Sequence, residues 1–332
     1  MQKLPNLPAS SQSLIGRALR ALSQICLLII AGAGLLSASA AEPGEGFINV
    51  PGGPVWYHIV GDGEGVPLLL LHGGPGGTSC GYSRFEVLGG ERPVVRYDQL
   101  GTGRSGRPDD LSLWTAEHYV EELQVLRDSL GLDEVHLLGH SWGAALAAAY
   151  VIEKGGEGIV SLTLSSPLLS TPAWVKDANT LRATLPVEVQ EVLSQHEAAG
   201  TTDSEEYQEA SQAFYRRFVY AGDRPPAVAA CDGVTGNRQI YRHMWGPTEF
   251  YATGNLRDFD LEPRLGEIDV PVLLVTGEFD EARPETVSGF RDRIRGAEFA
   301  VIAGVAHASY SKAMDDYLAV LRPFLAAAEA AR

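Results

Sequence analysis

Residues 135–150 have the sequence VHLLGHSWGAALAAAY, in which an apolar run of strand character leads through a glycine-flanked serine into an alanine-rich helical segment. Within it, Gly139-His140-Ser141-Trp142-Gly143 matches the G-x-S-x-G pattern of a nucleophile elbow, a sharp strand-to-helix turn that exposes a serine hydroxyl. The pattern alone occurs by chance in many chains, but the flanking strand and helix are the context that the turn requires. We therefore predict that Ser141 is a catalytic nucleophile.

A serine hydroxyl is a poor nucleophile at neutral pH, so a histidine must take its proton and an acid must orient that histidine. Downstream of Ser141 the histidines are His196, His243 and His307. His307 follows the last predicted strand, and α/β active sites assemble at the carboxyl ends of strands. The other two lie in a polar helical region and are predicted to be surface or packing residues. We predict that His307 is the general base.

The triad acid is expected between the serine and the histidine in the chain, again directly after a strand. The predicted strand 271–276 leads into Gly277-Glu278-Phe279-Asp280-Glu281. We predict Asp280 as the acid, with Glu278 and Glu281 as alternatives on sequence alone. Asp98 also follows a strand, but it would break the expected chain order.

The tetrahedral intermediate of acyl transfer needs backbone donors directed at its oxyanion. The run Leu71-His72-Gly73-Gly74-Pro75-Gly76-Gly77 lies directly after a predicted strand. We predict that the N–H of Gly74 is one donor and that the N–H of Trp142, the residue after the nucleophile, is the other. A glycine-rich turn also suits phosphate binding, but no Lys-Ser or Lys-Thr follows, so a P-loop is excluded.

Strand-like apolar runs alternate with helical patterns, which is typical of a mainly parallel sheet covered by helices on both faces. Eight strands are predicted near residues 46–50, 55–60, 67–72, 93–98, 135–139, 160–165, 271–276 and 298–303. Helices are predicted near residues 115–130, 142–154, 284–294 and 311–329. The fold class is therefore α/β.

Residues 167–258, which we call the cap segment, interrupt this alternation after the sixth strand. The segment is rich in Glu, Gln, Ala, Tyr and Arg and contains no strand-like run, so it is predicted to be helical. No linker-like stretch isolates it on both sides, which favours a cap over the site rather than an independent domain. The predicted core then consists of residues 41–166 and 259–332.

The first 40 residues have the pattern of a signal peptide. They contain no acidic residue, carry Lys3, Arg17 and Arg20, run apolar from 25 to 36, and end in the small residues 38–40. We expect cleavage after residue 40 and an exported, periplasmic or secreted protein without stable membrane insertion. The alternatives are an uncleaved membrane anchor and a mis-assigned start codon.

The chain has 332 residues, of which 45% are hydrophobic, as in a globular protein with one sizeable core. Its formal net charge is −16, which argues against nucleic acid as a partner. Cys26 lies in the leader, and Cys80 and Cys231 are too few for a metal site but free to pair in an oxidising compartment if their positions permit. The predicted chemistry needs no cofactor or metal, and the sequence carries no signal for oligomeric state.

Four segments together resemble the proline iminopeptidase family of α/β-hydrolases. They are HGGPG at 72–76, YDQLGTGRS at 97–105, GHSWG at 139–143 and GEFD at 277–280. The first two are more specific than the serine elbow, and the resemblance spans nearly the whole chain after the leader. It implies the α/β-hydrolase fold and the removal of an N-terminal residue, often proline, from short peptides, amino-acid amides or arylamides. The sequence departs from many relatives at His140, where they have Gln or Gly.

In that family, glutamates of the cap and the core bind the free α-amino group of the substrate. Gly246-Pro247-Thr248-Glu249-Phe250 resembles the cap motif and nominates Glu249, while Glu281 resembles the core glutamate. A buried ammonium must be paired, and carboxylates at the closed end of a pocket admit one residue only. The alternative for Glu249 is that it caps or solvates a helix.

The leading hypothesis is a serine exopeptidase that releases an N-terminal proline or another small residue through an acyl-enzyme. A second hypothesis is an esterase, lactonase or general amino-acid amidase that uses the same triad on small metabolites without needing a free amine. A third is a non-catalytic receptor, which the presence of all three triad residues disfavours. Dehalogenase and epoxide hydrolase activities are disfavoured, because those relatives need an aspartate at the position of Ser141.

Overall fold

The computed structural model describes residues 42–332. The predicted signal peptide, residues 1–40, and its cleavage site therefore lie outside the described residues. Within 42–332, no helix combines the length and the apolar character that crossing a membrane requires.

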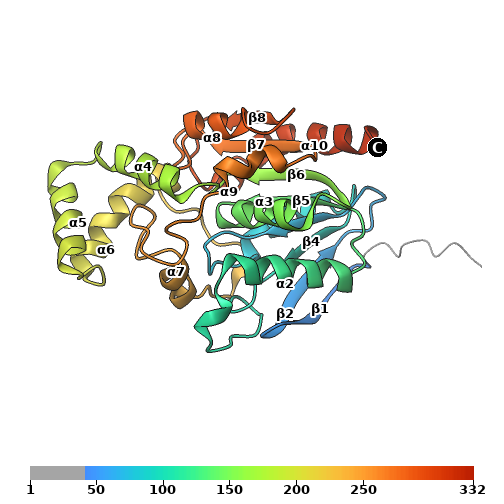
Figure 1. Ribbon diagram of the computed structural model, residues 1–332, viewed down its shortest axis with the longest axis horizontal. Coiled ribbons are helices and arrows are strands. Elements are labelled where there is room, and N and C mark those ends of the chain that lie inside the picture. Colours follow the sequence, from blue (N-terminus) through green and yellow to red (C-terminus); the bar gives the residue numbers. More distant parts are fainter. Residues whose placement is uncertain (1–41) are drawn as a thin grey trace, which may run out of the picture. The chain divides into compact units, whose positions relative to one another are not determined.

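An eight-stranded sheet forms the centre of the described chain (Figure 1), as predicted. Its spatial order is β1-β2-β4-β3-β5-β6-β7-β8, in which β1 and β2 form an antiparallel hairpin, β2 pairs antiparallel with β4, and all other pairs are parallel. The strands are β1 (Gly44–Val50), β2 (Gly53–Val60), β3 (Leu68–Leu71), β4 (Val94–Tyr97), β5 (Val135–His140), β6 (Ile159–Ser165), β7 (Val272–Gly277) and β8 (Glu298–Ile302). The carboxyl ends of the parallel strands consequently meet along one edge, where the site residues follow them.

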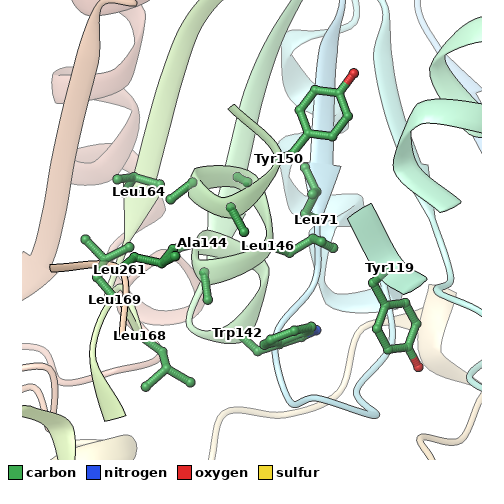
Figure 2. Packing of buried hydrophobic residues seen from close by; sticks show 14 of the residues in the cluster. Leu71, Tyr119, Trp142, Ala144, Leu146, Tyr150, Leu164, Leu168, Leu169 and Leu261 are labelled. Atoms are coloured by element: carbon green, nitrogen blue, oxygen red, sulfur yellow. The ribbon is translucent and has the colours of Figure 1, made fainter. Parts of the chain in front are cut away.

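The central strands are buried on both faces because helices cover each side. On one face, Leu69 and Leu71 of β3 pack in a cluster with α2 (Ala116–Ser129), α3 (Trp142–Lys154) and α8 (Pro284–Arg291). Figure 2 shows this packing around the α3 side chains. On the other face, Leu68 and Leu70 pack with the 3₁₀ helix η1 (Cys80–Leu88) and with α10 (Met314–Ala330).

The predicted helix over 311–329 is two helices in the structure. The short α9 (Ser309–Lys312) ends at Ala313, whose φ of −131° and ψ of 56° are not helical, and α10 follows directly. The prediction missed this break because alanine carries no turn signal. The 3₁₀ helix η1 was likewise not predicted.

The cap segment is helical and lies between β6 and β7 in the chain. Its helices are α4 (Thr171–Arg182), α5 (Val187–Ala199), α6 (Glu205–Phe214) and α7 (Arg238–Met244), with one π-helical turn, η3 (Tyr215–Val219). Side-chain caps start three of these helices: Ser170 accepts from the Ala173 N–H, Ser204 from the Tyr207 N–H, and Asn237 from the first turn of α7. In Figure 1 the four α-helices gather at the left end of the sheet.

Candidate active site

The turn between β5 and α3 holds Ser141 in a strained backbone conformation. Its φ is 56° and its ψ is −121°, a combination that non-glycine residues rarely adopt. A Cβ on Gly139 would lie 2.1 Å from the Gly143 carbonyl oxygen, and a Cβ on Gly143 would lie 2.0 Å from the Leu71 carbonyl oxygen. Only glycine fits at these two positions, so the G-x-S-x-G spacing is a steric requirement of the turn.

His307 and Asp280 form a hydrogen-bonded pair beside this turn. His307 Nδ1 lies 2.8 Å from Asp280 Oδ1, and Asp280 is 1% exposed. The ring of His140, the residue before Ser141, lies 4.6 Å from the His307 ring between centroids. The fold thus brings the loops after β5, β7 and β8 to one place, with 26 residues separating the acid from the imidazole in sequence and more than a hundred separating both from Ser141.

Four further donors surround the Asp280 carboxylate. They are Ser166 Oγ at 2.6 Å, Ala282 N at 2.8 Å, Thr276 Oγ1 at 3.0 Å and Gly277 N at 3.2 Å. Burial by itself would raise the pKa of Asp280, but the charge of His307 and these hydrogen bonds outweigh it, and the pKa of Asp280 is lowered. The carboxylate therefore stays ionised and holds a proton on His307 Nδ1, which leaves Nε2 free to accept one.

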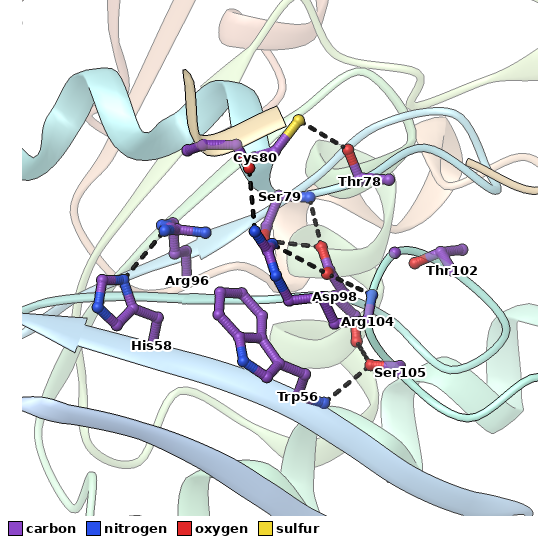
Figure 3. A network of polar contacts seen from close by, with 12 residues as sticks. Trp56, His58, Thr78, Ser79, Cys80, Arg96, Asp98, Thr102, Arg104 and Ser105 are labelled. Carbon is purple, nitrogen blue, oxygen red and sulfur yellow. Dashed lines mark hydrogen bonds and ion pairs between the residues drawn. The ribbon is translucent and has the colours of Figure 1, made fainter. Parts of the chain in front are cut away.

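The competing acids have other partners. Asp98 accepts from the Ser79 N–H and Oγ at 2.8 Å each and from the Arg104 N–H at 2.9 Å, as Figure 3 shows. These hydrogen bonds hold the loop after β4 against the start of η1, so the carboxylate of Asp98 stabilises the loop structure. Glu278 is exposed and accepts from the Gly304 N–H at 2.8 Å. Only Asp280 among these three contacts His307 Nδ1.

The glycine-rich loop after β3 runs against Ser141. A Cβ built on Gly73 would lie 3.1 Å from Ser141 Cβ, which shows how closely the two backbones approach. Among residues 42–332, neither the Gly74 N–H nor the Trp142 N–H has a hydrogen-bond acceptor. Two free backbone donors beside the nucleophile are what an oxyanion requires.

Gln99 connects this loop to the elbow. Its Nε2 donates to the His72 carbonyl oxygen at 2.9 Å, and its Oε1 accepts from Trp142 Nε1 at 3.0 Å. The Gln99 N–H donates to His72 Nε2 at 3.0 Å, and burial lowers the pKa of His72, so this imidazole is neutral with its proton on Nδ1. These residues connect the loop that carries Gly74 to the turn that carries Trp142, the two predicted oxyanion donors.

His140 packs between His307 and a tyrosine. Its ring meets the Tyr310 ring edge to face with centroids 5.1 Å apart, and its Nδ1 lies 3.2 Å from Ser165 Oγ. Burial, followed by the charge of His307, lowers the pKa of His140 well below its usual range. The imidazole of His140, beside the elbow, is therefore neutral at neutral pH.

Glu281 is buried beside His307 and Asp280. Its Oε1 lies 3.9 Å from His307 Nε2, and neither of its oxygens accepts a hydrogen bond from any residue in 42–332. Burial, then the negative charges of Glu249 and Asp280, raise the pKa of Glu281 well above its usual range. An unsatisfied buried carboxyl is costly, so this position calls for a ligand with a cation or hydrogen-bond donors.

Glu249 reaches the same place from the cap segment. Tyr241 donates its hydroxyl to Glu249 Oε1 at 2.8 Å, and burial raises the pKa of Glu249 while the charge of His307 opposes that shift. Trp174 connects the two regions, since its Nε1 donates to the Glu249 carbonyl oxygen at 3.0 Å and its ring centroid lies 5.5 Å from that of His307.

One short stretch of the cap segment is hydrogen-bonded to the loops that carry Asp280 and His307. The Phe218 carbonyl oxygen accepts from the N–H groups of both Glu281 and His307 at 3.2 Å, and the Val219 carbonyl oxygen accepts from the Ala308 N–H at 3.0 Å. A movement of η3 would therefore be transmitted directly to the acid and imidazole loops.

The remaining predicted residues lie elsewhere, and some site residues were missed. His196 contacts Thr201 and Glu206 within the cap segment, and His243 lies on α7. Ser166 and Trp174 were not predicted. Ser166, with a φ of 45°, directly follows β6, and a small polar residue after a strand is a signal that could have identified it. Trp174 lies on α4 and has no such local signal. Within residues 42–332, no group of three His, Cys, Asp or Glu side chains is placed to hold a metal ion.

Comparisons with known proteins agree with this arrangement. A family model described as alpha/beta hydrolase fold matches residues 66–312. The proline iminopeptidase of Heyndrickxia coagulans is 43% identical over 283 residues, which cover 85% of this chain and 98% of that protein. Among solved structures, the proline iminopeptidase of Mycobacterium smegmatis matches with a TM-score of 0.77 at 31% identity, covering 87% of this chain and 99% of that one. The structure of VinJ matches with a TM-score of 0.79 at 33% identity, covering 86% and 99%.

Proposed function

Because this chain belongs to the proline iminopeptidase family of α/β-hydrolases, we propose that it is a serine exopeptidase that releases an N-terminal proline, or another small residue, from short peptides or amino-acid amides. In this proposal Ser141 is the nucleophile, His307 the general base and Asp280 the acid that orients it. The N–H groups of Gly74 and Trp142 form the oxyanion hole.

The reaction proceeds in two steps, acylation of Ser141 and hydrolysis of the acyl-enzyme. Ser141 Oγ attacks the carbonyl carbon of the N-terminal residue while His307 Nε2 takes its proton, and the negative charge that develops on the carbonyl oxygen is held by the two backbone donors. His307 then gives the proton to the departing amine, which breaks the peptide bond and leaves an ester on Ser141. His307 then takes a proton from a water molecule that attacks the ester carbonyl, and it returns this proton to Ser141 Oγ as the N-terminal residue leaves as the free amino acid.

The unpartnered Glu281 carboxyl, 3.9 Å from His307 Nε2, is the observation that carries the exopeptidase assignment. An esterase or lactonase acting on neutral metabolites has no need of two desolvated carboxyl groups near its general base. A free α-ammonium supplies both a positive charge and N–H donors to Glu281 and Glu249. An internal peptide position carries no such charge, so the pair selects the N-terminus.

Acylation of the substrate amine tests this proposal. We expect L-prolyl and L-alanyl arylamides to be cleaved, and their N-acetylated counterparts to be cleaved at least about tenfold more slowly, because the blocked substrates would leave two buried carboxyl groups without a partner. The measurement is kcat/KM for each matched pair. Equal rates within a pair would reject the exopeptidase and favour the esterase, lactonase or general amidase hypothesis.

We propose further that the protein is exported. The leader pattern of residues 1–40 supports this, and so does the disulfide between Cys80 and Cys231, since such bonds persist mainly in oxidising compartments. When the full chain is expressed in a bacterium with a periplasm, we expect the protein in the periplasmic fraction with Ala41 at its N-terminus. Mass spectrometry of the intact protein measures this, and an uncleaved protein in the soluble cytoplasmic fraction would contradict it.

A further inference from the structure

A groove with a volume of about 720 Å³ opens beside the active site. Its walls come from the loop after β3, from the start of η1, from residues 220–236 of the cap segment, and from the start of α9. Neither Glu249 nor Glu281 lines it, so it is separate from the site proposed for the substrate amine.

The groove adjoins the groups that handle the leaving part of a substrate. Ala308, which lines it, directly follows His307, and Gly77, which also lines it, donates its N–H to the carbonyl oxygen of Gly73 at 3.2 Å. In acyl transfer the imidazole donates its proton to the departing amine, so the leaving group lies on the side of the histidine. The groove is therefore placed to receive the peptide beyond the scissile bond.

Arg84 and Arg224 are the only charged side chains among the groove-lining residues. Within residues 42–332, neither arginine forms an ion pair with a carboxylate. Arg84 is half-buried and donates from Nη2 to the Pro226 carbonyl oxygen at 3.4 Å, and the guanidinium carbon of the exposed Arg224 lies 6.0 Å from the centre of the Tyr220 ring. On a chain with a net charge of −16, a groove lined by two unpaired arginines and no acid is a local exception that favours an anion.

The disulfide holds the two arginine-bearing walls together. Cys80 begins η1, which carries Arg84, and Cys231 lies in the stretch of the cap segment that also carries Arg224, and both cysteines line the groove. The covalent link limits how far the walls separate, so both guanidinium groups stay near the same space.

We infer that this groove is the leaving-group subsite and that Arg84 and Arg224 bind a carboxylate of the departing peptide. The inference rests on the proposed exopeptidase function and deepens it by naming the substrate class: short peptides that end in a free carboxylate, or that carry an acidic side chain, after the first residue. A guanidinium matches a carboxylate through two parallel N–H donors.

The test compares four substrates: Pro-Gly, Pro-Gly amide, Pro-Glu amide and L-proline arylamide. We expect kcat/KM for Pro-Gly to exceed that for Pro-Gly amide by about tenfold, and added salt to reduce this ratio, because a charge-assisted hydrogen bond contributes that much and is screened at a partly exposed site. If Pro-Glu amide, rather than Pro-Gly, is preferred over Pro-Gly amide, the bound carboxylate is that of a side chain.

Three variants assign the preference to the arginines. Arg84→Gln and the exposed Arg224→Gln should each bring the ratio of kcat/KM for Pro-Gly to kcat/KM for Pro-Gly amide towards one. Arg84→Lys should retain part of the preference for Pro-Gly because the positive charge remains. Arg295→Gln, an exposed arginine that pairs with Asp269 away from the groove, should keep the wild-type ratio.

Two results would overturn the inference: kcat/KM for Pro-Gly and for Pro-Glu amide that both equal the value for Pro-Gly amide in the wild type, or an unchanged preference for the carboxylate substrate in both arginine-to-glutamine variants. Hydrolysis of the arylamide, which has no carboxylate, tests the exopeptidase function separately. Cleavage of the arylamide without a carboxylate preference therefore rejects the subsite alone, whereas absence of cleavage of all four substrates rejects the function on which it rests.

Discussion

Replacing Ser141 with alanine is expected to lower kcat/KM for L-proline arylamide by about 10⁵-fold. The substitution removes the only hydroxyl that the elbow presents beside His307, and no acyl-enzyme forms without it. Binding should survive, because the two glutamates and the cap segment are untouched. The measurement is the initial rate of arylamine release, together with the binding of L-prolinamide to the inactive variant.

Ser288→Ala provides the matched control, since Ser288 is a half-buried serine on α8 outside the site. It should retain the wild-type rate. A fluorophosphonate probe should label the wild type and the control but not Ser141→Ala, because only an activated serine reacts with it. Substantial retained hydrolysis or labelling in Ser141→Ala would refute the nucleophile assignment, and an unlabelled wild type would favour a non-catalytic receptor.

The fold was largely predictable because its strands are short apolar runs bounded by turn residues. All eight strands are confirmed, and so is the mostly parallel sheet. A strand buried on both faces is a short continuous run of apolar residues, and such a run can be recognised in the local sequence. The family resemblance drawn from four motifs is likewise confirmed. The break at Ala313 was not predictable, because it depends on how α9 and α10 pack rather than on any turn residue.

Site residues could be predicted where their order in the chain and their position after a strand restrict the candidates. They could not be predicted where only tertiary packing brings a side chain to the site. The chain order of serine, acid and histidine selected Asp280 and His307, whose side chains the structure places 2.8 Å apart. Trp174 was missed because a tryptophan in a helical segment is ordinarily a core residue, and only the fold places its ring beside His307. The neutral state of His140 likewise depends on burial between two aromatic neighbours.

Glu281→Gln is expected to lower kcat/KM for L-proline arylamide by roughly 10²–10³-fold, since truncating one partner of a buried ion pair costs about 2–5 kcal/mol. The amide side chain has nearly the same shape but no charge for the substrate ammonium. The loss should appear mainly as a higher KM, because the carboxylate binds a part of the substrate that does not react. On a small ester that lacks an amine, the same substitution should have a far smaller effect.

Glu278→Gln is the matched control, because Glu278 lies three residues earlier in the same loop but is exposed, and its carboxylate accepts from the Gly304 N–H. It should leave KM near the wild-type value. Glu249→Gln should also lower kcat/KM for L-proline arylamide, but by a smaller factor than Glu281→Gln. The reason is that the Glu249 carboxylate already accepts a hydrogen bond from the Tyr241 hydroxyl and so depends less on the substrate ammonium. Equal losses on the amine-free ester and on the arylamide would show that Glu281 supports the triad rather than the ammonium.

The stability of Glu281→Gln separates this role from a structural one. A carboxyl group whose folded-state pKa is raised binds its proton more tightly in the folded protein, so its ionisation destabilises the fold as pH rises above the unfolded pKa of about 4.3. Glutamine has no such ionisation, so the Tm of the variant should equal or exceed that of the wild type, with a difference that grows between pH 5 and pH 8. A Glu281→Gln variant that is less stable than the wild type at pH 8 would indicate that the carboxylate has a structural role. A variant that is more stable but less active would show that Glu281 lowers the stability of the fold and serves to bind the substrate ammonium.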